Sequence, residues 1–195
     1  MSPQENPVQD HAGAAAAAAL PEARDFDPAG SVILAVDDNE QNVELLQAYL
    51  ENLEVEVRTA FDGVEALEAV RNPPDGRRPD LLLLDVMMPR MSGFEVCRAL
   101  KDDPETAAIP IMMVTALNEL GDIERGVEAG TDEFVSKPIN RLELVTRVKG
   151  LLATSKLRRA GEDKDAQIRD LERLLDAGRR PSDADRLPDE RLGPG

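Results

Sequence analysis

The sequence predicts an α/β fold: a doubly wound, five-stranded parallel sheet with a helical C-terminal extension. Short apolar runs alternate five times with stretches of helical periodicity between residues 31 and 154. Such β/α units form parallel sheets, and their right-handed crossovers place helices on both faces. Polar residues stand where four of the apolar runs end, which predicts a functional site at the carboxyl edge of the sheet.

The elements follow from short apolar runs, which are typical of buried parallel strands, and from helical spacing between them. The expected strands are residues 32–36, 54–59, 81–84, 111–114 and 133–136. The expected helices are residues 39–52, 63–71, 92–102, 119–129 and 139–153. Residues that interrupt helices stand where these helices are expected to end. Two prolines and a glycine come soon after Asn72, and Pro104 follows the third helix. Gly130 follows the fourth helix, where a glycine can form a left-handed cap.

Composition divides the chain into four segments. Residues 1–30 form an Ala/Pro-rich leader and residues 179–195 a proline-containing tail, and we expect both to be disordered. Residues 31–154 form the folded domain, and residues 155–178 a helical extension. In that extension Ile168, Leu171, Leu174 and Leu175 recur at helical spacing. The extension could be a short coiled coil that makes a homodimer, or a solvated helix, and the spacing favours neither.

Charge and composition exclude several classes of protein. The net charge of −16 opposes nonspecific binding to DNA or anionic lipid. No apolar stretch reaches the roughly 18 residues of a membrane-spanning helix, and the first residues lack the positive region of a signal peptide. The single cysteine, Cys97, excludes an intramolecular disulfide and agrees with a reducing cytosol. We therefore expect a cytoplasmic protein with neither a DNA nor a membrane partner.

Three acidic residues end two of the predicted strands. Asp37 and Asp38 follow the first apolar run, and Asp85 follows the third. Adjacent carboxylates repel each other, so both can remain ionised if a hard cation lies between them and a third acid. Mg²⁺ prefers a few carboxylates together with water and phosphate oxygens. The set therefore predicts a Mg²⁺ site.

Thr115 and Lys137 end two further runs and would lie at the same edge. Their hydroxyl and ammonium groups can bind phosphoryl oxygens, and the bond between Lys137 and Pro138 can be cis in a tight turn. Phosphoryl transfer to a carboxylate depends on positioning and charge neutralisation, which these groups supply. Asp85 would be the nucleophile. A single Asp after a strand more often caps a helix, but capping does not explain the whole set.

Four segments resemble the signatures of the response-regulator receiver domain of two-component signalling: ILAVDDNEQN, LLLLDVMMPRMSGFEVC, IPIMMVTA and GTDEFVSKPI. The resemblance covers roughly residues 31–152 and implies a flavodoxin/CheY-like (βα)5 fold. It implies that Asp85 is the phosphoacceptor and that Asp37, Asp38, Asp85 and the backbone carbonyl of Met87 hold Mg²⁺.

The same resemblance assigns the remaining site residues. Thr115 and Lys137 match the hydroxyl and lysine of the catalytic set, and Phe134 matches the switch aromatic, which swings inward when the threonine is drawn to phosphate. Phe134 could equally be a core residue. The amino-acid sequence of these segments is most similar to that of receivers of diguanylate-cyclase regulators, but no GGDEF-type segment is present. We therefore expect no cyclic dinucleotide synthesis.

The resemblance implies a response regulator in a phosphorelay. Asp85 would accept a phosphoryl group from a phosphohistidine of a histidine kinase or phosphotransfer protein, and phosphorylation-dependent protein contacts would carry the signal to a downstream protein. Such a module catalyses only its own phosphoryl transfer and autodephosphorylation. We expect that hydrolysis to be slow, because the apolar Met87 and Leu117 cannot orient water.

Three alternatives differ in class. The chain could be a phospho-silent scaffold or dimerisation module with the receiver fold. An aspartyl-phosphate phosphatase is disfavoured, because Met87 stands where the haloacid-dehalogenase type has its second acid. A DNA-binding regulator is disfavoured too, since the roughly 40 residues after Thr154 show no helix-turn-helix pattern.

Overall fold

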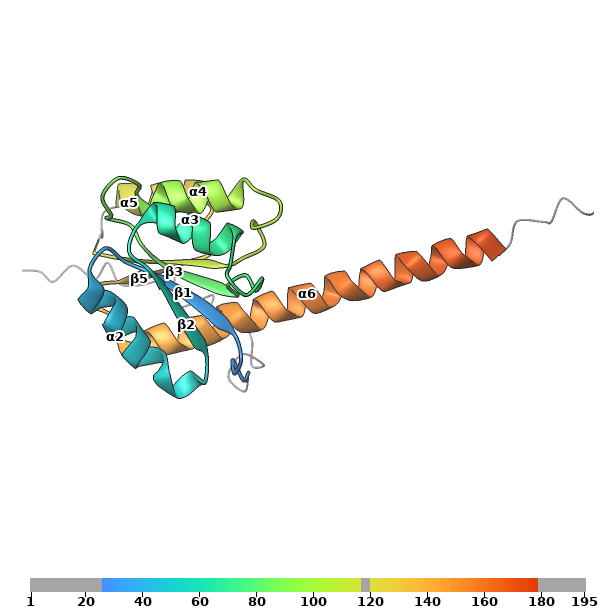
Figure 1. The fold of residues 1–195 in the computed structure, drawn as a ribbon, viewed down its shortest axis with the longest axis horizontal. Helices are drawn as coiled ribbons and strands as arrows, with labels where there is room; N and C mark the ends of the chain where they lie inside the picture. Colours follow the sequence, from blue (N-terminus) through green and yellow to red (C-terminus); the bar gives the residue numbers. More distant parts are fainter. Residues whose placement is uncertain (1–25, 117–119, 179–195) are drawn as a thin grey trace, which may run out of the picture. The chain divides into compact units, whose positions relative to one another are not determined.

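A computed structural model of the protein describes residues 26–116 and 120–178 (Figure 1). Most of the predicted leader, the predicted tail at 179–195 and Leu117 lie outside the described residues. The chain divides into two compact units after Lys156. The first unit contains the sheet, and within the described residues no helix is both long and apolar enough to cross a membrane.

Five parallel strands form one sheet in the order β2-β1-β3-β4-β5. They are β1 (Val32–Val36), β2 (Glu56–Ala60), β3 (Leu81–Asp85), β4 (Ile111–Thr115) and β5 (Glu133–Ser136). The predicted doubly wound sheet is confirmed. Strand β2 begins two residues later than the sequence predicts, because Glu54 has a φ of 51° and cannot continue an extended strand. Strands β3 and β4 run one residue further than predicted and include Asp85 and Thr115.

Helices cover both faces of the sheet. They are α2 (Glu40–Leu50), the 3₁₀ turn η2 (Glu51–Leu53), α3 (Gly63–Arg71), α4 (Gly93–Lys101), α5 (Leu120–Ala129) and α6 (Arg141–Gly178). Helices α3, α4 and α5 lie on one face, while α2 and the first turns of α6 lie on the other (Figure 1). Gly130 has a φ of 86° and ends α5 as predicted.

Helix α6 continues past the predicted end at residue 153 and includes the predicted helical extension. The residues after 153 are mostly good helix formers, which explains why the helix does not stop there. The coiled-coil seam depends on Leu171, Leu174 and Leu175, whose side chains lie outside the described part of the chain. Dimerisation through this helix therefore stays a prediction.

The core explains why the strand sequences are apolar throughout. Every residue of β1, β3 and β4 is buried, because helices cover both faces of these central strands. Side chains of a strand alternate between the faces, so Leu82 packs toward α3 and α4 while Leu83 packs toward α2 and α6. Burying each such side chain contributes roughly 1.5–3 kcal/mol. The sheet is thus a rigid support for the residues at its carboxyl edge.

Candidate functional site

The carboxyl edge of the sheet gathers the polar residues that the sequence singles out. Asp37 follows β1, Asp85 and Thr115 are the last residues of β3 and β4, and Lys137 follows β5. The parallel register places these strand ends side by side, since Asp85 pairs with Val114 and Thr115 with Ser136. Asp37 is 2% exposed, and Asp85 and Thr115 are each 5% exposed. The edge is therefore a polar site with little access to water.

Lys137 joins the two buried carboxylates. Its Nζ lies 2.7 Å from Asp37 Oδ2 and 2.6 Å from Asp85 Oδ1. Its position is set by β5, which ends one residue earlier, and by the Lys137 N–H, which donates to the Thr115 carbonyl at 2.8 Å. The Lys137–Pro138 peptide bond is cis. The ammonium thus offsets part of the repulsion between carboxylates from two neighbouring strands.

Helix α2 holds Asp37 in place. Asp37 Oδ1 accepts the backbone N–H of Asn39 at 2.9 Å, and both carboxylate oxygens accept the Asn42 amide, at 2.9 and 3.0 Å. Asn39 also caps α2, because its side chain accepts the Gln41 N–H. Asn42 was not among the predicted site residues. Its place in the first turn of the helix after Asp37 is the sequence signal that could have identified it.

Asp38 and Met87 take no part in the contact between Asp37, Lys137 and Asp85 through their side chains. Asp38 is exposed. The Met87 N–H donates to Asp85 Oδ2 at 2.7 Å, and the Met87 side chain faces solvent with 66% of its surface exposed. Within the described residues, no three Asp, Glu, His or Cys side chains are grouped closely enough to hold a metal ion. Asp37 and Asp85 meet through Lys137, and Asp38 remains outside that contact.

Burial and neighbouring charges shift the pKa values of Asp85 and Lys137. Burial raises the pKa of Asp85, and the nearby Asp37 carboxylate adds to this effect, whereas Lys137 and the Met87 N–H oppose it. Burial lowers the pKa of Lys137, but its hydrogen bonds to Asp37 and Asp85 outweigh that effect and leave the pKa above its ordinary value. Two carboxylates share the one ammonium of Lys137, so their contact has room for a further positive charge. Carboxylate oxygens are the ligands that Mg²⁺ prefers, so the donor set fits this ion.

The start of helix α4 lies against the backbone of Asp85. A Cβ on Gly93 would collide with the Asp85 carbonyl oxygen, so only glycine allows this approach. Ser92 and Glu95 form a capping box that fixes the first turn of α4. The position of Asp85 is thus determined by both the strand before it and the helix after it.

Phe134, the predicted switch residue, lies on β5 and is partly buried. Its ring packs on the cluster beneath α3, α4 and α5. Gly126 of α5 provides the room, because a Cβ there would overlap the Phe134 ring and lie 3.3 Å from the Met113 sulfur. Phe134 is therefore in contact with the core, while its movement stays a prediction.

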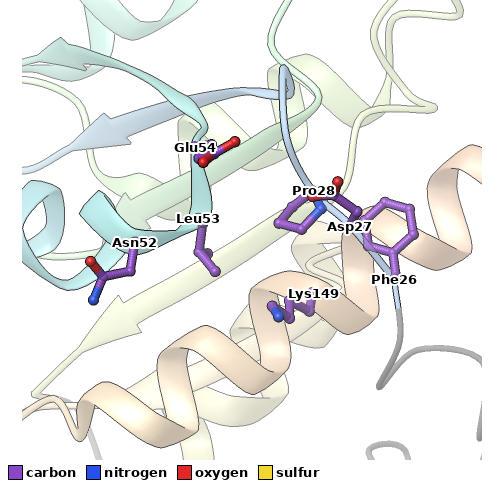
Figure 2. Close-up of a pocket in the computed structure, with 7 residues that line it drawn as sticks. All are labelled: Phe26, Asp27, Pro28, Asn52, Leu53, Glu54 and Lys149. Carbon is purple, nitrogen blue, oxygen red and sulfur yellow. The ribbon is translucent and has the colours of Figure 1, made fainter.

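A concavity of 420 Å³ lies at the opposite edge of the sheet (Figure 2). It is lined by Phe26, Asp27, Pro28, Asn52, Leu53, Glu54 and Lys149. Two of the lining segments precede β1 and β2, which places them at the amino ends of the strands. The hollow is shallow and contains no buried polar side chain from the predicted set, so we place the candidate site at the carboxyl edge.

Comparison with known proteins agrees with this geometry. The family model of the response regulator receiver domain matches residues 33–149, which is more than half of the chain. The chain belongs to this family. Receiver domains are signalling modules of two-component systems that interact with histidine kinases and downstream effectors, and phosphorylation of an aspartate and use of Mg²⁺ are typical of them.

Three similar proteins illustrate the range of the family. Response regulator PleD of Caulobacter vibrioides is 50% identical over 119 residues, which cover 61% of this chain and 25% of PleD. The alkaline phosphatase synthesis transcriptional regulatory protein PhoP of Bacillus subtilis is 42% identical over 125 residues, which cover 64% of this chain and 50% of PhoP. The crystal structure of the phosphorylated cyanobacterial phytochrome response regulator RcpA has a TM-score of 0.56 and 32% identity, covering 63% of this chain and 91% of RcpA. The chain thus spans half or less of the two curated relatives.

Proposed function

We propose that this receiver domain accepts a phosphoryl group on Asp85 from a phosphohistidine of a histidine kinase or a histidine phosphotransfer protein. The observation that supports the proposal most directly is the contact of Lys137 with both Asp37 and Asp85 at a buried sheet edge. A structure of RcpA in its phosphorylated form, which is similar in fold, also supports it.

In the proposed transfer, a carboxylate oxygen of Asp85 attacks phosphorus while the P–N bond of the phosphohistidine breaks. The bonding electron pair returns to the imidazole, and Asp85 becomes an acyl phosphate. The Lys137 ammonium neutralises charge on the phosphoryl oxygens, and the Thr115 hydroxyl donates to one of them. These groups act by position and charge, which is how most enzymes that transfer phosphoryl groups lower the barrier.

Mg²⁺ is part of this proposal. Asp37, Asp38, Asp85 and the backbone carbonyl of Met87 would hold the ion, which when bound offsets negative charge on the phosphoryl oxygens. Asp37 and Asp85 are two buried acids that share one ammonium, that of Lys137, and their oxygens are hard donors suited to a divalent ion. Asp38 is adjacent to Asp37 and exposed, so it is accessible to the ion.

The proposed output is a change in protein contacts. Thr115 would move toward the phosphate, and Phe134, which contacts the core beside Gly126, would follow. The surface of α5, β5 and α6 would then present a different shape to a downstream protein or to a second copy. A cytoplasmic location belongs to the same proposal, since the buried free thiol of Cys97 suits a reducing compartment.

Phosphorylation of the full chain by acetyl phosphate and Mg²⁺, followed by intact-mass spectrometry, tests the proposal. We expect one phosphoryl group per wild-type chain, none on Asp85→Asn and one on the control Asp75→Asn, which alters an exposed acid. Absence of phosphorylation in wild type would favour the silent scaffold. Repeated turnover of a phosphomonoester would favour the phosphatase.

A further inference from the structure

The loop between β3 and α4, residues 86–92, is attached to Asp85 at its base. The Met87 N–H donates to Asp85 Oδ2 at 2.7 Å, and the Gly93 N–H donates to the Val86 carbonyl at 3.0 Å, which closes the loop. This loop includes the Met87 carbonyl, which is a ligand in the proposed Mg²⁺ site. Its conformation therefore bears directly on that site.

Arg90 at the tip of this loop has an unusual backbone conformation. Its φ is 70°, in the left-handed region, which is unfavourable for a residue with a side chain. Such conformations persist only where surrounding contacts maintain them. Two contacts are present here. The Met91 N–H donates to the Pro89 carbonyl at 2.8 Å, and the Arg90 guanidinium, on a side chain that is 68% exposed, forms an ion pair with the Asp62 carboxylate from the turn before α3.

Asp62 is well placed to hold the loop. Its carboxylate is only 9% exposed and is itself fixed, because Oδ1 accepts the backbone N–H groups of Val64 and Glu65 at 2.7 and 2.9 Å. The other oxygen, Oδ2, is the one that accepts from Arg90. Asp62, which caps α3 in the connection after β2, thus also holds the loop between β3 and α4.

A packing contact reinforces the ion pair. A Cβ added to Gly63 would lie 2.8 Å from the Cβ of Met91, so the Met91 side chain fills the space that glycine leaves. Gly63 and Met91 adjoin Asp62 and Arg90 in the sequence. The two turns therefore meet through an ion pair and an adjacent close packing contact.

We propose that the Asp62–Arg90 pair positions the β3–α4 loop so that the Met87 carbonyl and Asp85 can bind a divalent cation together. This inference rests on the proposed function. Asp62 and Arg90 would touch neither the cation nor the phosphoryl group, so they are positioning residues. Groups that hydrogen-bond a metal ligand change metal affinity by about 10- to 100-fold when they are removed, and this pair acts one step further out, through the loop, so we expect the lower end of that range.

Two variants separate the loop contact from the stability of the fold. Arg90→Gly removes the guanidinium and places at this φ the residue that adopts it without strain. Asp62→Asn removes the charge but keeps a side-chain oxygen that caps α3. The matched control is Glu54→Gly, since Glu54 is the other described residue with a side chain and a positive φ, at the opposite edge of the sheet. Arg90→Lys tests partial rescue by a conservative change.

Hydrogen exchange of the protein without Mg²⁺, followed by calorimetric titration with Mg²⁺, provides two measurements that do not depend on phosphorylation. We expect faster exchange of residues 87–92 and roughly tenfold weaker Mg²⁺ binding in Arg90→Gly and Asp62→Asn. Glu54→Gly should match wild type, and Arg90→Lys should lie between. The double variant should be no weaker than either single variant, because both remove the same contact.

Unchanged loop exchange and unchanged Mg²⁺ affinity in both single variants would overturn the inference. If Arg90→Gly misfolds and Asp62→Asn does not, the hydrogen exchange and Mg²⁺ affinity of Asp62→Asn decide whether the inference holds. Failure of the proposed function looks different, since wild type would then bind Mg²⁺ without accepting a phosphoryl group from acetyl phosphate. The two hypotheses therefore fail in distinguishable ways.

Discussion

Replacing Lys137 with methionine tests how the buried acids are stabilised. Methionine has a similar length but no charge, so the Asp37 and Asp85 carboxylates lose donors at 2.7 and 2.6 Å. Breaking a buried ion pair costs 3–5 kcal/mol, and the 22% exposure of the Lys137 side chain places the expected loss near the lower end, at about 3 kcal/mol. For a domain of this size that loss lowers Tm by about 10 °C.

The sign of the pH dependence makes the test specific. Because burial already raises the pKa of Asp85, ionised Asp85 lowers stability above the ordinary Asp range, and loss of the ammonium increases this penalty. The deficit of Lys137→Met should therefore be largest near pH 7 and shrink as pH falls and Asp85 is protonated. Since the pKa of Lys137 is raised, its own contribution is complete at pH 7 and is lost only at strongly alkaline pH.

Thermal unfolding at pH 7 and pH 5 completes the test. The chains compared are wild type, Lys137→Met, the double variant Lys137→Met/Asp85→Asn and the control Lys149→Met. Asp85→Asn in the Lys137→Met background should recover much of the lost stability, because Asp37 is then the one carboxylate left of the two that Lys137 contacts. Lys149→Met, at the opposite edge of the sheet, is the control and should change Tm little. An unchanged Tm in Lys137→Met, or no recovery in the double variant, would refute the view that the ammonium stabilises both carboxylates.

Three further changes probe the site. Gly93→Ala should destabilise the fold by roughly 1–3 kcal/mol and abolish phosphorylation, because its Cβ collides with the Asp85 carbonyl; normal phosphorylation and Tm would contradict this. Gly126→Ala should displace the Phe134 ring and weaken beryllofluoride binding measured by NMR; unchanged Phe134 ring signals would contradict this. Met87→Asn should speed loss of phosphate from Asp85, measured by intact mass over time, because an amide can orient water; an unchanged half-life would refute the role given to the apolar side chain.

The central strands and the site edge could be predicted because each depends on local pattern. Residues 81–84 are all apolar because helices cover both faces of their strand, so the run predicts a buried strand. A polar residue that ends such a run must lie at the edge of the sheet. Asp85, Thr115 and Lys137 were located in this way. No knowledge of the strand order was needed for that step.

What the pattern could not supply depends on contacts between distant segments. Arg90 and Asp62 are 28 positions apart, and the residues around each of them carry no pattern that predicts their ion pair. The left-handed conformation of Glu54, which delays β2, occurs at a residue type that gives no signal for it. The orientation of Asn42 toward Asp37 depends on how α2 packs on the sheet, and periodicity alone does not reveal this.

The Lys137 bridge also bears on how the chain is made. Asp37 and Lys137 are 100 residues apart, and Lys137 follows the last strand of the sheet. Asp37 and Asp85 are translated before Lys137, so a nascent chain that ends before β5 contains both acids without the ammonium that contacts them in the fold. Contacts of such sequence separation form slowly. The edge that we expect to carry phosphate therefore gains its ammonium only after all five strands have been synthesised.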